Sequence, residues 1–277
     1  MQYSTSQRPS IFWTGKKGDV FQPAVQGTLA LLEAAYKYAA DSLQMFVYMS
    51  SLVTLLNPSH PPSHHYTSLS WNDSATCSVS ALADDASAPF CDLYPASKVL
   101  AERAVFSFRK RVKPSFGIAS VIPGVVIGPP VLFPERAGDV NGTIKPVWEV
   151  LSGENRGVPR VVGSRSGAFV DVRDLVGVCA GLLGFEGVGM GEVDGKRVII
   201  VAGKADTAVM GRALVGKYPE RLGHLKSVLE DGRGEVEGQG STFDTDDAEK
   251  ALGRPWTTYE KSVLDTAEAF ERYLGKT

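Results

Sequence analysis

Two compact apolar runs flank a helical pattern in the first half of the chain. The runs span residues 45–51 and 116–122 and are bounded by polar residues or proline, which is typical of buried parallel strands. Between them, apolar residues recur at helical spacing, at Ala96, Val99, Leu100, Ala104 and Phe108. The pattern predicts a strand, a helix and a parallel strand, with Pro95 in the first helical turn. Ser51 and Pro123 then fall at the carboxyl ends of the strands, where ligands bind in open parallel sheets.

The rest of the chain is less regular. Residues 23–40 are predicted to form a helix before the first strand, and residues 258–273 a closing helix. Residues 57–89, rich in Ser, Pro and His, are expected to form a long loop, and loops of that length are often functional. Shorter strands are predicted at residues 160–162, 168–172 and 197–201.

Tyr94 and Lys98 stand four residues apart in the predicted helix, so they share one face, one turn apart. An ammonium about 5 Å from a phenol oxygen, at an effective dielectric near 20, favours the phenolate by roughly 3 kcal/mol, enough to lower a phenol pKa of about 10 by about two units. Such a phenol can exchange a proton near neutral pH. The spacing also arises by chance on solvated helix faces, but its place between two strands favours a proton-transfer site.

Several further segments follow the sequence pattern of one known family. They are residues 23–29 (PAVQGTL), 46–51 (FVYMSS), 71–72 (WN), 122–129 (IPGVVIGP), 169–174 (FVDVRD) and 243–253. With Tyr94 and Lys98, they make the chain resemble an extended short-chain dehydrogenase/reductase of the NAD-dependent epimerase/dehydratase superfamily. Within that superfamily it is similar to the branch of dihydroflavonol, cinnamoyl-CoA and fungal aldehyde or ketone reductases.

The resemblance implies an α/β fold with a Rossmann-like doubly wound parallel sheet. We expect a partial dinucleotide-binding domain over residues 1–128. Residues 129–277 would form a smaller substrate-binding lobe, with some strands and helices returning to the main sheet. The implied function is an NAD(P)-dependent oxidoreductase, with NADP or NAD as cofactor, that reduces an aldehyde or ketone or oxidises the alcohol by hydride transfer.

The resemblance also assigns roles to individual residues. The catalytic residues would be Ser51, Tyr94 and Lys98: Tyr94 supplies the proton, Lys98 lowers the pKa of the tyrosine and binds the nicotinamide ribose, and Ser51 holds the carbonyl oxygen. Ser51 is preferred to Ser50, which is expected to be a buried residue at the strand end. The residues implied to contact the cofactor are Tyr94, Lys98, Pro123, Gly124, Val125 and Val126.

Complete members of the family begin with a strand, a Gly-x-x-Gly-x-x-Gly turn and a helix. Here Gly15 and Gly18 mimic the first two glycines, but Phe21 stands at the third position, and no room remains for a second strand before residue 45. We therefore expect Gly15 and Gly18 to form a plain surface turn and the sheet to lack its N-terminal part. The strand at 45–51 would then have an uncovered edge, which invites self-association.

Composition and charge narrow the possible partners. The net charge of −2 over 277 residues predicts no attraction to nucleic acid or to an anionic membrane. Three cysteines, an odd number without metal-ligand spacing, make disulfides and a metal site unexpected. The longest apolar stretch, residues 175–185, is too short to span a membrane, and the first residues lack the apolar core of a signal peptide. With the resemblance, this indicates a cytoplasmic protein that acts on a small-molecule carbonyl or alcohol.

Three other features have structural interpretations. His60, His64 and His65 lie close in sequence but have no acidic or thiol neighbour, so we interpret them as solvated side chains and not as metal ligands. Residues 163–167 (GSRSG) are interpreted as a hairpin turn in preference to an anion nest. Residues 171–174 are interpreted as a helix start with an internal ion pair.

Two alternatives to the reductase hypothesis stay open. The same Ser51, Tyr94 and Lys98 framework serves epimerases, dehydratases and hydroxysteroid dehydrogenase/isomerases. The missing glycine-rich segment instead favours a noncatalytic, truncated remnant that binds a partner through its sheet edge. Affinity for NADPH distinguishes the remnant from both kinds of enzyme.

Overall fold

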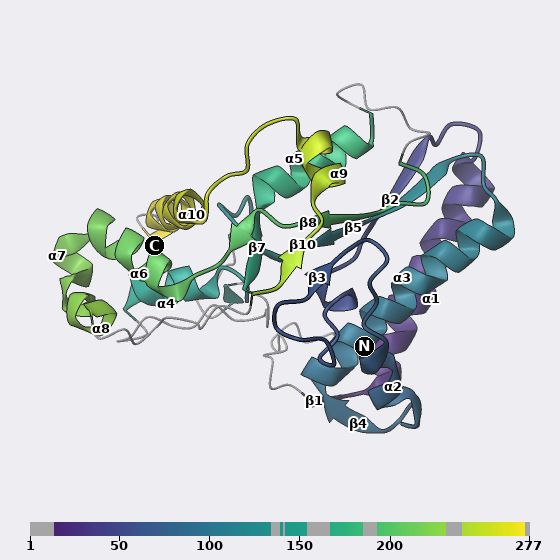
Figure 1. Cartoon of the computed structure of the whole chain (residues 1–277), viewed down its shortest axis with the longest axis horizontal. Helices are drawn as coiled ribbons and strands as arrows, with labels where there is room; N and C mark the ends of the chain where they lie inside the picture. Colours follow the sequence, from purple (N-terminus) through teal and green to yellow (C-terminus); the bar gives the residue numbers. More distant parts are fainter. Residues whose placement is uncertain are drawn as a thin grey trace. The chain divides into compact units, whose positions relative to one another are not determined.

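The computed structural model describes residues 14–133, 139–140, 142–153, 167–184, 193–230 and 240–274 (Figure 1). The strands are β1 (Thr14–Lys16), β2 (Met45–Met49), β3 (His65–Tyr66), β4 (Ser87–Pro89), β5 (Gly117–Pro123), β6 (Val125–Ile127), β7 (Ala168–Asp171), β8 (Arg197–Ile200), β9 (Gly203–Lys204) and β10 (Thr242–Phe243). The α-helices are α1 (Lys17–Ala39), α2 (Asp73–Ser80), α3 (Phe90–Val112), α4 (Lys145–Ser152), α5 (Val172–Leu182), α6 (Thr207–Lys217), α7 (Pro219–Leu222), α8 (Lys226–Glu230), α9 (Asp246–Leu252) and α10 (Tyr259–Leu274). Two 3-10 helices are η1 (Leu52–Thr54) and η4 (Gly223–Leu225).

The described residues divide into two compact units that alternate along the sequence. The first draws on residues up to Pro123 and on 177–200 and 241–253, and the second on residues 124–176, 201–240 and 254 onwards. The sequence predicts a dinucleotide-binding domain that ends at residue 128 and a substrate-binding lobe that follows it. This functional division stays a prediction.

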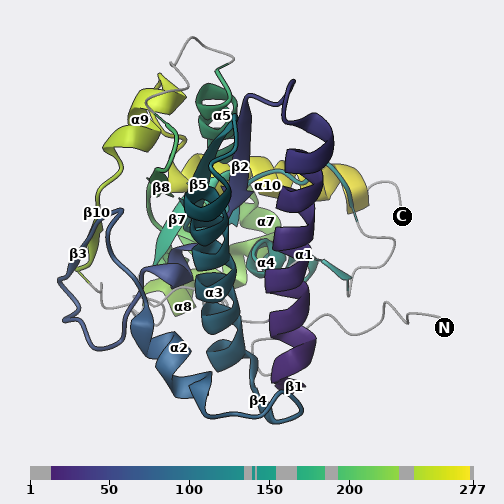
Figure 2. The same ribbon diagram turned by 90° about the vertical axis from the view of Figure 1, so that its right-hand side faces the viewer.

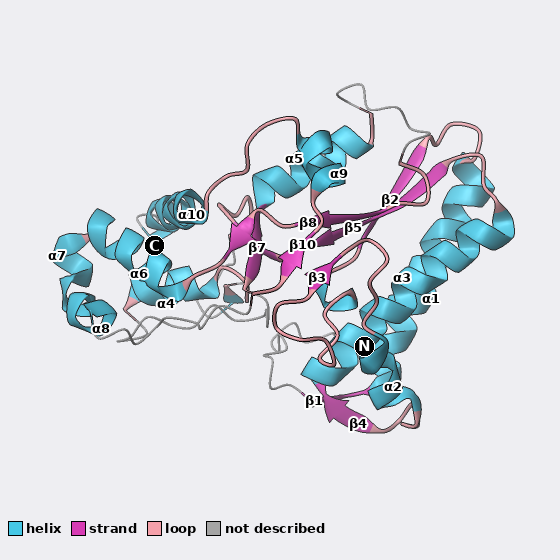
Figure 3. Cartoon of the chain, viewed as in Figure 1, coloured by secondary structure: helices cyan, strands magenta, loops and turns pink. Residues whose placement is uncertain are grey.

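The first unit contains a three-stranded parallel sheet in the order β2-β5-β8 (Figures 1 and 3). In its register Tyr48 pairs with Ser120, and Ser120 with Arg197. The predicted strand, helix and strand are therefore confirmed as β2, α3 and β5, in a Rossmann-like α/β arrangement. Because β2 and β5 are parallel, the position after Met49 and Pro123 both lie at the carboxyl end of the sheet.

Helices α1 and α3 lie side by side and pack on the sheet (Figure 2). Leu32 of α1, Val105 and Phe108 of α3, and Ile118 of β5 form one buried cluster between the layers. These residues come from the apolar faces of two amphipathic helices and one strand. Their burial fixes α3 against the strands and so determines where Tyr94 and Lys98 lie relative to the carboxyl end of β2.

Strand β2 is less buried than its sequence predicts. Met45 is buried, but Phe46, Val47 and Tyr48 are half-buried and Met49 is 45% exposed. The reason is its position, because no described strand pairs with β2 on the side away from β5. The expectation of a fully buried strand is thus wrong, whereas the uncovered edge is observed in the described part of the chain.

Several predicted boundaries also change. α3 begins at Phe90, so Pro95 lies inside the helix and not in its first turn. Residues 57–89, expected to be a loop, contain β3, α2 and β4. Asn72 caps α2, its side chain accepting a hydrogen bond of 3.1 Å from the backbone N–H of Ala75. Strand pairing with distant segments and the Asn72 cap therefore stabilise secondary structure that the Ser- and Pro-rich composition did not predict.

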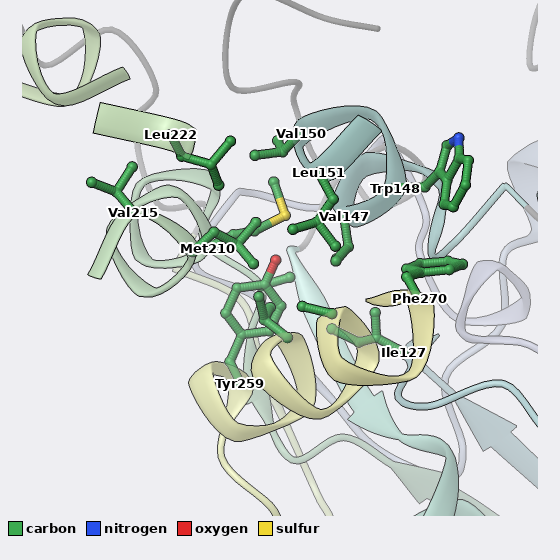
Figure 4. Packing of buried hydrophobic residues seen from close by; sticks show 14 of the residues in the cluster. Ile127, Val147, Trp148, Val150, Leu151, Met210, Val215, Leu222, Tyr259 and Phe270 are labelled. Atoms are coloured by element: carbon green, nitrogen blue, oxygen red, sulfur yellow. The ribbon is translucent and has the colours of Figure 1, made fainter. Parts of the chain in front are cut away.

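The second unit is built around the sheet β6-β7-β9 and helices α4, α6 and α10. Its core includes Trp148 of α4, Met210 of α6, and Tyr259 and Phe270 of α10 (Figure 4). The predicted closing helix is confirmed as α10. The predicted strand at residues 160–162 and most of the predicted turn at 163–167 lie outside the described residues.

The predicted ion pair at the start of α5 is confirmed. Arg173 Nη2 lies 2.8 Å from Asp171 Oδ2, and Arg173 Nη1 lies 2.6 Å from Asp265 Oδ2. Asp171 also accepts a hydrogen bond of 2.6 Å from Ser262 Oγ, and these donors hold the pKa of its carboxyl below the usual value although burial acts the other way. The role of this pair is to fix α10 against β7. Within the described ranges, no helix combines the length and the apolar character needed to cross a membrane.

Candidate functional site

Lys98 binds the carboxyl end of β2. Its Nζ donates a hydrogen bond of 2.8 Å to the backbone carbonyl of Met49 and lies 5.3 Å from the centre of the Tyr48 ring. The backbone of Gln44 and of Ser50 bonds to β5, and backbone groups alternate in direction along a strand. The Met49 carbonyl therefore points to the free edge of β2, and Lys98 occupies that edge two residues before Ser51.

The environment of Lys98 acts on its pKa in two directions. Burial lowers the pKa of the ammonium, and the negative charge of Glu102, one turn further along α3, raises it. Burial has the larger effect, so the pKa of Lys98 lies below the ordinary lysine value. The bond to Met49 holds this half-buried ammonium at the end of β2.

Ser50 and Ser51 differ as the sequence predicts. Ser50 is 4% exposed, and its Oγ donates a hydrogen bond of 2.7 Å to Glu102 Oε2. Ser51 is half-buried and precedes η1 without a side-chain capping bond. Its backbone carbonyl, and not its hydroxyl, accepts the bond of 2.9 Å from Thr54 Oγ1. The prediction that Ser50 is a buried strand-end residue is confirmed.

Tyr94 lies one turn before Lys98 on α3 and is half-buried. Its ring stacks on that of Phe90 with 5.2 Å between ring centres. Burial, together with the charges of Glu102 and Tyr94, raises the pKa of Tyr48 to about 12, although a hydrogen bond with Thr28 acts in the other direction. Tyr94 therefore lies one helical turn from the ammonium that binds the end of β2.

Residues 123–126 connect the two sheets. Pro123 is the last residue of β5 and is buried, and Val125 and Val126 begin β6, where they pair with Phe169 and Val170. Gly124 lies between the strands, where a Cβ atom would stand 2.7 Å from the carbonyl oxygen of Ala168. A side chain at this position would displace the backbone, so the sequence requires glycine here.

Gly15 and Gly18 do not form the surface turn expected from the sequence. Gly15 is part of β1 and pairs with Ala88 of β4, while Gly18 lies in the first turn of α1. The backbone N–H groups of Lys17 and Gly18 donate to the carbonyls of Ala86 and Asp84, at 2.9 and 2.8 Å. A phosphate cradle needs such N–H groups free, so the start of α1 does not fit a pyrophosphate.

A buried ion pair beside the site was not predicted. Arg197 Nε of β8 lies 2.9 Å from Glu102 Oε1 of α3, and the two side chains are 7% and 0% exposed. Glu102 continues the four-residue spacing of Tyr94 and Lys98, so the sequence does carry one signal for it. The partner could not be inferred from spacing, because Arg197 is 95 positions away.

The histidines of the loop are only partly solvated. The rings of His60 and His64 lie 3.9 Å apart, and the Nδ1 atom of His60 is buried without a hydrogen-bond partner. Burial and the two neighbouring histidines lower the pKa of His64. Nowhere in the described ranges do three side chains of the types His, Cys, Asp and Glu cluster to hold a metal.

Comparison with curated proteins finds similarity along most of the chain. An uncharacterised oxidoreductase of Saccharomyces cerevisiae is 30% identical over 257 residues, which make up 90% of this chain and 69% of that protein. The NADPH-dependent methylglyoxal reductase GRE2 of the same yeast is 26% identical over 270 residues, 95% of this chain and 74% of the relative. Aldehyde reductase 2 of Sporidiobolus salmonicolor is 28% identical over 262 residues, 92% and 71%. No family model matches the chain.

Comparison with solved structures finds the same fold. The yeast methylglyoxal/isovaleraldehyde reductase Gre2, solved with NADPH, superposes with a TM-score of 0.71 at 22% identity, over 95% of this chain and 74% of that one. Vestitone reductase from alfalfa gives a TM-score of 0.63 at 20% identity, over 92% and 73%. The Rossmann-like fold expected from the sequence is thereby confirmed.

Proposed function

The chain belongs to the extended short-chain dehydrogenase/reductase family, and on this premise we propose that it reduces a small aldehyde or ketone with NADPH. The observation that carries the proposal is the binding of Lys98 Nζ at the carboxyl end of β2, beside Ser51 and one turn from Tyr94. The relatives named as an NADPH-dependent methylglyoxal reductase and an aldehyde reductase support the cofactor and the substrate class.

When bound, NADPH supplies the hydride that is added to the carbonyl carbon. Tyr94 Oη donates the proton to the carbonyl oxygen, which becomes the hydroxyl of the alcohol. Ser51 Oγ donates a hydrogen bond to the same oxygen and stabilises the charge that develops there. Lys98 Nζ stabilises the tyrosinate left behind and holds the ribose hydroxyls. Pro123, Gly124, Val125 and Val126 are assigned to the nicotinamide as a prediction from the sequence.

Lys98 can make these contacts without giving up its bond to β2, because an ammonium has three N–H donors. In the structure its Nζ is bonded to the Met49 carbonyl, which is a neutral acceptor at a free strand edge. The other N–H groups of the ammonium can bind ribose hydroxyl oxygens and the oxygen of Tyr94. The Met49 carbonyl thereby orients the ammonium beside the site.

The test is a titration and a turnover assay on the whole chain. NADPH fluorescence should show saturable binding with micromolar affinity, and NADPH oxidation should follow on addition of aldehydes and ketones such as methylglyoxal. A chain that binds NADPH but turns over no carbonyl, and instead retains and recycles NAD, would support an epimerase. A chain with no affinity for NADPH would support the noncatalytic remnant and reject the proposal.

Self-association through the edge of β2 is a second part of the proposal. Met45 and Val47 direct their backbone groups to the side where no described strand pairs, and such an edge can add a strand from a second copy. Val47→Pro removes one N–H from that edge and none from the bonds to β5, so it should abolish a dimer seen by analytical ultracentrifugation while keeping the fold. An unchanged dimer would place the contact elsewhere.

The expected cytoplasmic location also stays a proposal. It is supported by three free thiols, Cys77, Cys91 and Cys179, of which two are exposed. Free exposed thiols persist in a reducing compartment.

A further inference from the structure

The carboxylate of Glu102, on α3, binds side chains that lie in or directly after the three strands of the parallel sheet. Glu102 accepts hydrogen bonds from Ser50 Oγ at 2.7 Å, from Ser120 Oγ at 2.7 Å and from Arg197 Nε at 2.9 Å. Ser50 follows β2, Ser120 belongs to β5, and Arg197 begins β8. Glu102 is fully buried, so these bonds replace its hydration completely.

Arg197 also binds the loop between β3 and α2. Its Nη1 donates to the backbone carbonyls of Ser68 and Ser70, at 2.7 and 2.6 Å. Its guanidinium lies 3.6 Å from the centre of the Trp71 ring. The loop backbone is therefore fixed by an arginine that is itself fixed by Glu102.

Two groups of the proposed reaction are adjacent to this carboxylate. Ser50, held by Oε2, directly precedes Ser51, so the bond restricts the turn that carries the Ser51 hydroxyl. Lys98 lies one turn before Glu102 on the same helix, and Glu102 is the charged group that favours its protonated form. Glu102 thus acts on the reacting atoms indirectly, through Ser50 on the Ser51 hydroxyl and through its charge on Lys98.

Stability alone is a weak explanation for such an arrangement. Burying a carboxylate and a guanidinium costs desolvation free energy that their attraction often only just offsets, and apolar replacements of similar volume are often as stable. A carboxylate that binds three side chains in one buried, low-dielectric environment can instead fix their geometry.

We propose that Glu102 is a positioning residue for the reduction: it orients the Ser50–Ser51 turn and supplies the negative charge beside Lys98, while Arg197 holds the carboxylate in place. The proposal rests on the function proposed above, because it assigns roles to Ser51 and Lys98. Glu102 itself contacts neither substrate nor cofactor.

The first test measures Lys98 directly and needs no turnover. The lysines of the whole chain are labelled by reductive methylation with ¹³C-formaldehyde, the Lys98 signal is assigned with Lys98→Arg, and its pKa is read by NMR titration. Glu102→Gln should lower the pKa of Lys98 relative to the wild type, and Ser120→Ala, which removes one bond to the carboxylate but no charge, should leave it unchanged. An unchanged pKa of Lys98 in Glu102→Gln would overturn the electrostatic part of the proposal.

The second test uses Ser50→Ala, which cuts only the link to the Ser51 turn and keeps the ion pair. We expect kcat to fall about 10- to 100-fold while the dissociation constant of NADPH stays the same. Ser120→Ala is the matched control, because it removes a hydroxyl from the same carboxylate on the neighbouring strand, and its kcat should stay within about twofold of the wild type. Equal kcat values for Ser50→Ala and the wild type would overturn the positional part.

The two failures are distinguishable. A wild-type chain without carbonyl turnover rejects the proposed function and, with it, the assignment of a positioning role in the reduction. A wild type with turnover, combined with unchanged Lys98 titration in Glu102→Gln and unchanged kcat in Ser50→Ala, rejects the positioning role while the function stands.

Discussion

The Nζ of Lys98 and the backbone carbonyl of Met49 are joined by a hydrogen bond of 2.8 Å. The bond ties the first half of α3 to the last residue of β2, at the edge where no described strand pairs. It brings an ammonium to the point where a strand ends and a serine follows. The proposed chemistry depends on this meeting of helix and strand.

The two serines after β2 should respond differently to the loss of a hydroxyl. Ser51→Ala is expected to lower kcat by about 100-fold or more, since it removes a donor to the carbonyl oxygen, and to leave the free energy of unfolding within about 0.5 kcal/mol of the wild type. Ser50→Ala should lower the free energy of unfolding by about 1–3 kcal/mol, because it leaves a buried carboxylate oxygen short of a donor. Urea denaturation and steady-state kinetics check both. If instead Ser50→Ala lowered kcat more than Ser51→Ala, and Ser51→Ala lowered the free energy of unfolding more than Ser50→Ala, Ser50 and not Ser51 would hold the carbonyl oxygen.

Tyr48 should make the stability of the fold sensitive to alkaline pH. Burial and the charge of Glu102 raise its pKa to about 12 in the folded chain, whereas an unfolded tyrosine titrates near 10. The folded state thus holds the proton more tightly, so the contribution to stability is complete below about pH 10 and is lost as the pH rises through about 12. Urea denaturation at pH 9 and pH 11 should show a smaller decline for Tyr48→Phe than for the wild type. An equal decline would contradict the raised pKa.

A glycine in α5 is expected to be irreplaceable, in contrast to one in α6. A Cβ atom at Gly181 would collide with the backbone carbonyl of Ala251, whereas nothing lies within 4 Å of a Cβ at Gly216. Gly181→Ala should therefore lower the free energy of unfolding by about 1–3 kcal/mol. Gly216→Ala, also inside a helix, should raise it by up to about 1 kcal/mol. Thermal unfolding of the two variants beside the wild type measures both, and a tolerated Gly181→Ala would refute the close approach of α5 and α9.

The sequence predicted those parts of the fold whose information is local. β2, β5, α3 and α10 are marked by apolar periodicity, and the family motifs place Ser51 and Lys98 at one strand end. β1 and β4 were missed because two short polar segments form strands only by pairing with each other. α2 was missed although Asn72 is a recognisable cap, because Ser-rich segments have weak helical propensity.

The proximity of Tyr94 and Lys98 could be predicted for the same reason, whereas their catalytic roles stay predictions. Tyr94 and Lys98 are neighbours through helix geometry alone, so spacing was sufficient. Glu102 was missed because a charged side chain on a helix is normally assigned to solvent. Its burial depends on Ser120 and Arg197, which reach it only through the pairing of β5 with β8. The degree of exposure of β2 also depends on which strands surround it, and a local pattern does not carry that information.

Removal of the Tyr94 hydroxyl tests most directly the claim that this residue donates the proton. Tyr94→Phe removes the hydroxyl that is proposed to donate the proton and keeps the ring that stacks on Phe90. With NADPH and a carbonyl that the wild type reduces, kcat should fall by about 100-fold or more, while the dissociation constant of NADPH and the melting temperature stay close to the wild-type values. Turnover by Tyr94→Phe at the wild-type rate would contradict the account.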